Sequence, residues 1–194
     1  KCGKIFFKQE EITGMSVKER CKRGIGYIPS DRYKRAILPG FSLKDNYLLG
    51  NQYKDSYARK GMLNQEYIEK KTKELMEKFD VRAVNGDQLI GALSGGNQQK
   101  LVLSREVDKD PDLILACQPV RGLDIGAIKF IHNVLLELRN QGKAVLLISA
   151  ELSDLFQLSD RIGVLYKGEM MSLQETEKYT TESISLLMAG KKGV

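Results

Sequence analysis

The 194-residue sequence lacks the features that define several protein classes. It has only three cysteines, at positions 2, 21 and 117, and none belongs to a C-x-x-C pair. So few and so widely spaced cysteines cannot form a disulfide framework and argue against a zinc site, which fits a reducing compartment. The longest strongly apolar stretch, Ala144 to Ile148, is far shorter than the roughly 20 residues that cross a bilayer as a helix.

Concentrated charge and histidine are also scarce. Lys and Arg number 31 against 25 Asp and Glu, so the net charge is +6, and no run of five basic residues occurs. This distribution does not indicate a nucleic-acid or anionic-membrane surface. The single histidine, His132, makes no catalytic constellation, so a packing or surface role is favoured. With 42% hydrophobic and 29% charged residues, the composition is typical of a globular protein rather than a disordered one.

The order of apolar and polar residues predicts a mixed α/β chain. We expect strands at 4–12, 24–29, 113–116, 144–149, 161–166 and 169–172, and helices at 16–23, 65–79, 94–108, 125–140, 151–158 and 181–188. The stretch from Phe41 to Ile90 is highly charged and reads as a helical insert. After it, helices alternate with fully apolar strands, which predicts a parallel sheet covered on both faces.

The segment A-L-S-G-G-N-Q-Q-K at 92–100 joins the insert to the α/β part. Ser94 is a favourable N-cap, and Gly95 and Gly96 follow it at the start of the expected helix. A helix N-terminus offers unpaired N–H groups, glycines let a phosphate approach them, and a serine hydroxyl adds a donor. On Leu93 to Asn97 alone, an ordinary capped turn is the more frequent explanation, because short motifs match by chance.

Two later segments change that balance. Residues 113–124 read L-I-L-A-C-Q-P-V-R-G-L-D, and residues 147–152 read L-I-S-A-E-L. In this order, the three segments resemble the nucleotide-binding domain of ATP-binding-cassette (ABC) transporters over essentially the whole chain. Asn97 in place of the usual Gln, together with I-P-S-D-R at 28–32, resembles the C-terminal cassette of double-cassette sugar and nucleoside importer ATPases.

The resemblance implies an α/β fold of the ABC-type P-loop NTPase class, with a mainly parallel sheet, an antiparallel edge and a helical subdomain. It divides the chain into an N-terminal edge strand and Q-loop region at 1–40, a helical subdomain insert at 41–90, and a signature helix with the α/β core at 91–194. No G-x-x-x-x-G-K-[ST] motif occurs, so the Walker A strand and helix are lacking. Since that motif precedes this region in the family, we expect a truncation before Lys1, and a chain that is less stable than the intact domain or that dimerises.

The positions that act on ATP in the family are altered here. The Walker B strand should end in an Asp for Mg²⁺ and a Glu that polarises water, but Cys117 and Gln118 stand there. A neutral thiol is a poor Mg²⁺ ligand, and a glutamine cannot take a proton at neutral pH. Cys117 is better explained as a small buried hydrophobe. The switch-histidine position holds Ala150 and the Q-loop glutamine position holds Ser30, so we expect a hydrolytically weak site.

The resemblance assigns the signature loop to a different nucleotide. In ABC dimers, each nucleotide lies between the Walker motifs of one domain and the signature loop of the other. The residues implied at ATP held by the N-terminal cassette of the same protein are Leu93, Ser94, Gly95, Gly96 and Asn97, with Asp124 bridging the same interface. ATP and Mg²⁺ are therefore expected in the complete protein, and neither is expected to bind this chain tightly.

The function implied is that of part of the ATP-binding subunit of an ABC importer, an ATPase that couples ATP binding and hydrolysis to sugar or nucleoside uptake. The isolated chain should be inactive. The implied partners are the N-terminal cassette, integral membrane permease subunits and, indirectly, a substrate-binding protein, at the cytoplasmic face of the membrane and without nucleic acid. The charged residues 31–35 and the insert are explained equally well by docking to the permease or by a solvated surface.

Two other functions stay open. A regulatory module could bind nucleotide without hydrolysing it, and an intact cassette upstream on the same polypeptide would argue against it. A soluble ABC ATPase could act on nucleic acid, but that reading requires a concentrated basic patch or a long coiled-coil insert.

Overall fold

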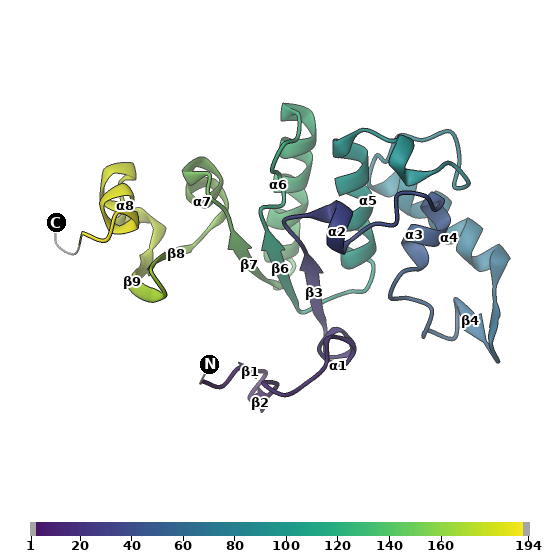
Figure 1. Ribbon diagram of the computed structural model, residues 1–194, viewed down its shortest axis with the longest axis horizontal. Helices are drawn as coiled ribbons and strands as arrows, with labels where there is room; N and C mark the ends of the chain where they lie inside the picture. Colours follow the sequence, from purple (N-terminus) through teal and green to yellow (C-terminus); the bar gives the residue numbers. More distant parts are fainter. Residues whose placement is uncertain (1–2, 192–194) are drawn as a thin grey trace. The chain divides into compact units, whose positions relative to one another are not determined.

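The computed structural model describes residues 3–191, which divide into two compact units, one up to Leu146 and the other from Leu147 onward (Figure 1). Lys1 and Cys2, on which two of the expectations above fall, lie outside the described residues. Cys21 and Cys117 are free thiols.

A three-stranded sheet forms the centre of the first unit. Its order is β3 (Ile25–Ile28), β6 (Leu113–Cys117) and β7 (Ala144–Ile148), the last of which crosses the division between the units. β3 and β6 are parallel, with Ile25 opposite Leu113 and Ile28 opposite Ala116. The predicted α/β class with a parallel sheet is therefore confirmed. Since the carboxyl ends of parallel strands meet at one edge, the residues that follow β3 and β6 share that edge.

Two long helices carry most of the core beside these strands. α5 (Gly95–Val107) contacts β3 and packs against α6 (Ile125–Asn140), as Figure 1 shows. Several of their side chains are fully buried, namely Leu101, Leu103 and Ile131 on the helices and Ile28 and Ile114 on the strands. Burying each of these contributes about 1.5–3 kcal/mol, so this contact fixes where α5 begins relative to α6.

A helical segment lies against the other side of α5. It contains α3 (Leu43–Leu48) and α4 (Gln65–Lys78), and both contact α5. α4 covers nearly all of the helix expected at 65–79, and its residues Ile68, Thr72 and Leu75 are buried. The segment also contains a hairpin of β4 (Ala58–Arg59) and β5 (Met62–Leu63), which the helical interpretation missed. Its two-residue turn, Lys60–Gly61, has positive φ at both positions, a conformation typical of tight hairpins.

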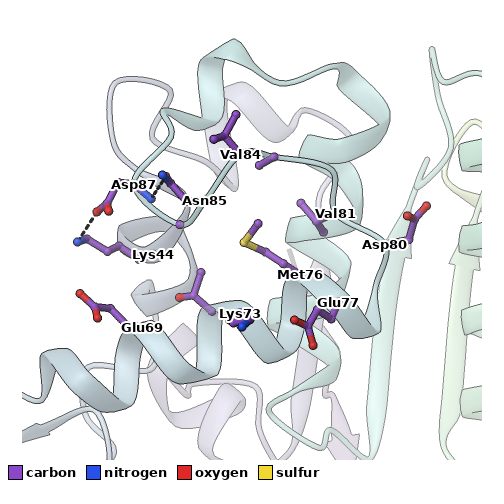
Figure 2. A pocket seen from close by; sticks show the side chains of 13 residues that line it. Lys44, Glu69, Lys73, Met76, Glu77, Asp80, Val81, Val84, Asn85 and Asp87 are labelled. Carbon is purple, nitrogen blue, oxygen red and sulfur yellow. Dashed lines mark hydrogen bonds and ion pairs between the residues drawn. The ribbon is translucent and has the colours of Figure 1, made fainter.

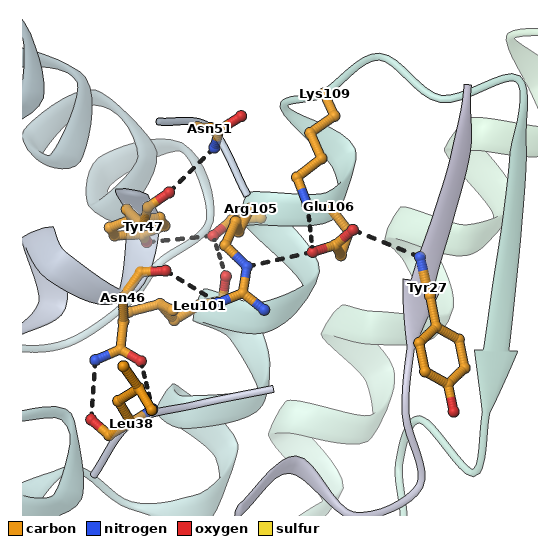
Figure 3. Close-up of polar contacts among 10 residues, drawn as sticks. Tyr27, Leu38, Asn46, Tyr47, Asn51, Leu101, Arg105, Glu106 and Lys109 are labelled. Carbon is orange, nitrogen blue, oxygen red and sulfur yellow. Dashed lines mark hydrogen bonds and ion pairs between the residues drawn. The ribbon is translucent and has the colours of Figure 1, made fainter. Parts of the chain in front are cut away.

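A polar network joins α5 to α3 and β3 (Figure 3). The Arg105 guanidinium donates to the backbone oxygen of Asn46 at 3.0 Å and to Glu106 at 3.2 Å. Glu106 also accepts from the Lys109 ammonium at 2.7 Å and from the Tyr27 backbone N–H at 3.5 Å. These partners satisfy buried charges that would otherwise destabilise the helix, so α5 has a fixed position in the unit.

The N-terminal part differs from expectation. Residues 4–12 do not form one edge strand but a hairpin of β1 (Phe6–Phe7) and β2 (Glu10–Glu11), which is a two-stranded sheet of its own. The reason is local, because Lys8 and Gln9 have φ of 49° and 66° and reverse the chain between the strands. The predicted helix at 16–23 is confirmed as α1 (Val17–Lys22), with Ser16 and Glu19 forming a capping box.

The prediction that helices cover both faces is wrong for β7. Ala144, Leu146 and Ile148 are exposed, whereas Val145 and Leu147 are half-buried. The strand is therefore covered on one face only. An all-apolar sequence shows that both faces favour burial but does not supply the element that would cover the second face.

The second unit contains α7 (Leu152–Leu158), an antiparallel pair of β8 (Arg161–Tyr166) and β9 (Glu169–Glu175), and α8 (Thr181–Met188). Lys167 and Gly168, both with positive φ, form the turn between β8 and β9. The core of the second unit is formed by Ile162, Val164, Tyr179 and Ile184. Within residues 3–191, no helix is both long and apolar enough to cross a membrane.

Candidate functional site

The turn at Ser94 lies at the surface of the first unit. A single 3-10 turn, η1 (Ile90–Ala92), leads into it, and Ser94 caps α5 with φ −61° and ψ 155°. The cap predicted from the sequence is confirmed. Ser94 is exposed, Leu93, Gly95 and Asn97 are half-buried, and Gly96 is buried. Ser94 is therefore on a side where another molecule can approach the start of α5.

Asn97 links this turn to the end of the helical segment. Its side-chain Nδ2 donates to Ser94 Oγ at 3.1 Å, and its backbone N–H donates to the same oxygen at 3.4 Å. Its Oδ1 accepts from the backbone N–H of Arg82 at 3.0 Å. The amide therefore contacts both the cap and the chain that leaves α4.

The two signature glycines allow close approaches that a side chain would block. A Cβ on Gly96 would lie 3.1 Å from Asp124 Oδ2 and 3.0 Å from the Ala127 Cβ. A Cβ on Gly95 would lie 2.6 Å from Arg32 Nη2. The structure thus brings two predicted site elements together, the signature turn and Asp124, and adds a guanidinium that the sequence did not indicate.

Asp124 caps α6 beside the signature turn. Its Oδ1 accepts from the Ala127 backbone N–H at 2.9 Å. This hydrogen bond holds the pKa of the Asp124 carboxyl below its usual range, with smaller effects from neighbouring N–H groups and from Lys100. Asp124 is exposed and carries a negative charge at neutral pH.

Gln98 and Arg32 both lie against the turn, and sequence reasoning missed both. Gln98 is fully buried, and its Nε2 donates to the backbone oxygens of Leu93 at 3.1 Å and Ile90 at 3.2 Å. Its Oε1 accepts from Arg32 Nε at 3.1 Å. The only sequence signal is that polar residues continue into α5 at positions that a core helix would fill with apolar side chains.

The end of β6 holds Cys117 and Gln118, the two residues that the sequence analysis expects at altered Walker B positions. Cys117 and Gln118 are half-buried, and Gln118 has a φ of 48°. Burial raises the pKa of the Cys117 thiol, against the smaller lowering effect of a hydrogen bond with Tyr27, so the thiol is neutral at pH 7. The neutral Cys117 thiol does not fit Mg²⁺, which favours oxygen ligands. Across residues 3–191, no group of three or more His, Cys, Asp or Glu side chains could hold a metal ion.

The two remaining predicted positions are both exposed. Ser30 follows β3 and shares the sheet edge with Gln118. Ala150 follows β7 and belongs to the second unit.

A cavity of about 500 Å³ lies in the helical segment, between α4 and residues 80–87 (Figure 2). Figure 2 shows Met76 extending from α4 toward this loop, and Lys44 paired with Asp87 at its rim. Among the described residues, those predicted for the nucleotide site do not line this cavity. Its charged lining carries both signs, including Lys73 and Glu77, and therefore does not select for one charged ligand.

Comparison with known proteins gives a consistent family. A family model described as "ABC transporter" matches residues 1–121. The chain is 42% identical over 188 residues to the guanosine import ATP-binding protein NupO of Bacillus subtilis and 37% identical over 188 residues to the nucleoside import ATP-binding protein NupA of Lactococcus lactis. Each alignment covers 97% of this chain and 37% of the relative, so the chain spans little more than a third of their length.

Solved structures agree on the fold. The dimeric ATP-binding cassette MJ0796, in a post-hydrolysis state bound to ADP and Pi, superposes with a TM-score of 0.73 at 22% identity. The superposition covers 91% of this chain and 75% of that cassette. A cassette of an ABC transporter, MJ1267, gives a TM-score of 0.72 at 21% identity and covers 96% and 73%. With the family model over more than half of its length, this chain belongs to the ABC transporter family, in the ATP-binding domain.

Proposed function

We propose that this chain is part of the ATP-binding subunit of an ABC importer and helps to couple ATP binding and hydrolysis to nucleoside or sugar uptake. Members of this family are ATPases that use ATP with Mg²⁺. Two relatives of 42% and 37% identity are named for guanosine and nucleoside import, and one of 32% for ribose import. Because the relatives named for nucleosides have the higher identities, a nucleoside is favoured as the transported substrate.

The observation that carries the proposal is the exposed Ser94 turn at the start of α5. The exposed Ser94 hydroxyl, the N-terminus of a 13-residue helix and the Arg32 guanidinium beside Gly95 lie close together. Such donors stabilise negative charge on a phosphate. In our proposal they act on ATP held by another cassette, the N-terminal one of the same protein, and Asp124 lies at the same interface.

The chain's own site is proposed to be hydrolytically weak. A neutral thiol at Cys117 and an amide at Gln118 stand where a metal ligand and a general base are needed. Neither group can supply that chemistry at neutral pH. We therefore infer that the chain supplies hydrogen-bond donors to the nucleotide site of the N-terminal cassette and does not hydrolyse ATP efficiently at its own site.

The same proposal assigns a role to each segment of the chain. Residues 41–90 and the charged residues 31–35 would face integral permease subunits, 91–194 would carry the signature helix and core, and 1–40 the Q-loop region. The complex would lie at the cytoplasmic face of the membrane and receive its substrate from a binding protein.

The test is the ATPase rate of the complete ATP-binding protein, assembled with its membrane subunits, for two alanine variants. Ser94→Ala should lower kcat by about 100-fold, because removing one donor aimed at developing charge typically costs that much. Gln118→Ala should change kcat less than twofold. The Gln118 amide accepts no proton in the parent protein, so its removal takes away no catalytic base.

Equal losses from both variants would contradict the asymmetry. If Ser94→Ala left the rate unchanged while Gln118→Ala weakened nucleotide binding, the chain would be a regulatory module with its own ligand, and the proposal would be wrong.

A further inference from the structure

We propose that Asn97 is a positioning residue that orients the hydroxyl proton of Ser94 outward, toward the phosphate that this hydroxyl binds. The inference rests on the proposed function of the signature turn. It assigns to a side-chain amide a task that the turn's backbone cannot perform alone, because a serine hydroxyl rotates freely unless its neighbours restrict it.

The orientation of the Asn97 amide follows from hydrogen-bond chemistry. The backbone N–H of Arg82 can only donate, so the side-chain atom 3.0 Å from it must be the oxygen, Oδ1. The other end of the amide is then Nδ2, which can only donate. It lies 3.1 Å from Ser94 Oγ, so this oxygen must accept.

The Ser94 oxygen is thereby fully committed as an acceptor from within the chain. It accepts from Asn97 Nδ2 and from the Asn97 backbone N–H, at 3.1 and 3.4 Å. A hydroxyl has two acceptor lone pairs and one proton. With both lone pairs directed at Asn97, the proton points away from α5. Because Ser94 is exposed, that direction leads out of the unit.

The Arg82 N–H that fixes the amide is itself held in place. Two residues before it, Asp80 accepts from the ammonium of Lys100, on α5, at 2.6 Å through its carboxylate and at 3.0 Å through its backbone oxygen. Lys100 is 8% exposed and also lies 4.7 Å from the centre of the Phe130 ring. The chain that leaves α4 is thus attached to α5 at Lys100 and at Asn97, one turn apart.

The test compares Asn97→Asp, Ser94→Ala and the double variant in the complete, membrane-assembled ATP-binding protein. Asn97→Asp keeps an oxygen toward the Arg82 N–H but places a second oxygen beside Ser94. That oxygen accepts the hydroxyl proton and turns it inward. We expect kcat to fall about tenfold or more, with a KM for ATP within twofold of the parent, because the lost donor acts on the transition state.

Two controls separate positioning from folding and from charge. The melting temperature of Asn97→Asp should match that of the parent, because the contact with Arg82 remains. Asn133→Asp adds the same charge to α6, outside the insert proposed to face the permease, at a position whose side chain is exposed. Its kcat should be unchanged. The neutral variant Asn97→Ala should lower kcat in the same direction as Asn97→Asp.

The double variant decides the inference. If Asn97 acts through the hydroxyl, adding Asn97→Asp to Ser94→Ala lowers kcat no further. A multiplicative loss in the double variant, or a normal kcat for Asn97→Asp while Ser94→Ala is crippled, overturns the inference and leaves the proposed function standing. A normal kcat for Ser94→Ala overturns the proposed function itself, and the inference with it.

Discussion

The ion pair between Asp80 and Lys100 makes the free energy of unfolding depend on pH. The hydrogen bond from Lys100 holds the pKa of the Asp80 carboxyl below its ordinary value of 3.8. A group with a lowered folded pKa contributes stability above its unfolded pKa and loses that contribution as the pH falls through the folded value. The Asp80–Lys100 pair should therefore stabilise the chain at neutral pH and weaken below about pH 4.

We predict that Asp80→Asn lowers the free energy of unfolding by under about 1 kcal/mol at pH 7, because the carboxylate is half exposed and screened by solvent. The difference from the parent should shrink as the pH falls from 5 to below 3.8. Urea unfolding at a series of pH values measures it. A difference that stays constant across this range would show that the carboxylate charge is not the cause.

At this scale, the sequence predicted the residues that act locally and missed those that depend on tertiary contact. The Ser94 cap follows from residues within one turn, so it could be predicted. Arg32 and Gln98 are 66 positions apart, and only the packing of α5 beside the end of β3 brings them together. The Asn97–Arg82 contact likewise requires the chain after α4 to return to α5.

Among the elements, the junction of α5 with α6 is the most constrained. A methyl group on Gly96 would press on Ala127 and Asp124, in the first turn of α6. A methyl group on Gly95 would press only on the far end of the flexible Arg32 side chain, and its contact with Leu123 Cδ2 at 3.7 Å would be an ordinary one. The two neighbouring glycines therefore form a matched pair for measuring how rigid the junction is.

We predict that Gly96→Ala destabilises the chain by about 1–2 kcal/mol through overpacking. Gly95→Ala should have a free energy of unfolding equal to or slightly above the parent's, since alanine favours helix by roughly 0.8 kcal/mol over glycine. Thermal or urea unfolding of both variants measures the contrast. Equal changes in the free energy of unfolding for the two variants would mean that α6 moves away from the added methyl group as easily as the Arg32 side chain does.

Element boundaries were predictable wherever a cap or a turn residue marks them. α6 and α8 span the residues expected, and α5 begins directly after its serine. The hairpins β1–β2 and β4–β5 were missed, because strands of two residues carry too little pattern to distinguish from loop. The cover of β7 was misjudged because what lies over a strand is a property of the whole fold.

For the molecule as a whole, the exposed face of β7 has a consequence in solution. Leu146 and Ile148 are 53% and 52% exposed on the same face of the strand. Exposed apolar patches promote association. The chain studied alone should therefore self-associate at micromolar concentrations, and the double variant Leu146→Ser with Ile148→Ser should sediment as a smaller species. Identical sedimentation of both proteins would rule out this face as the contact.

The family could be predicted from the sequence because three motifs occur in a fixed order. Each motif alone is weak evidence, but their order along the chain is specific. In the proposed function, the Ser94 turn forms one half of a nucleotide site whose other half belongs to another cassette. The central claim is therefore about contact with a partner's phosphate.

That contact can be measured directly in the complete protein, assembled with its membrane subunits and trapped with ADP and orthovanadate. Ultraviolet irradiation oxidises and cleaves the chain at residues that touch the vanadate, and mass spectrometry locates the cut. We predict cleavage at Ser94, and its loss in Ser94→Ala. Trapped vanadate that cleaves the protein elsewhere but leaves Ser94 intact would contradict the account.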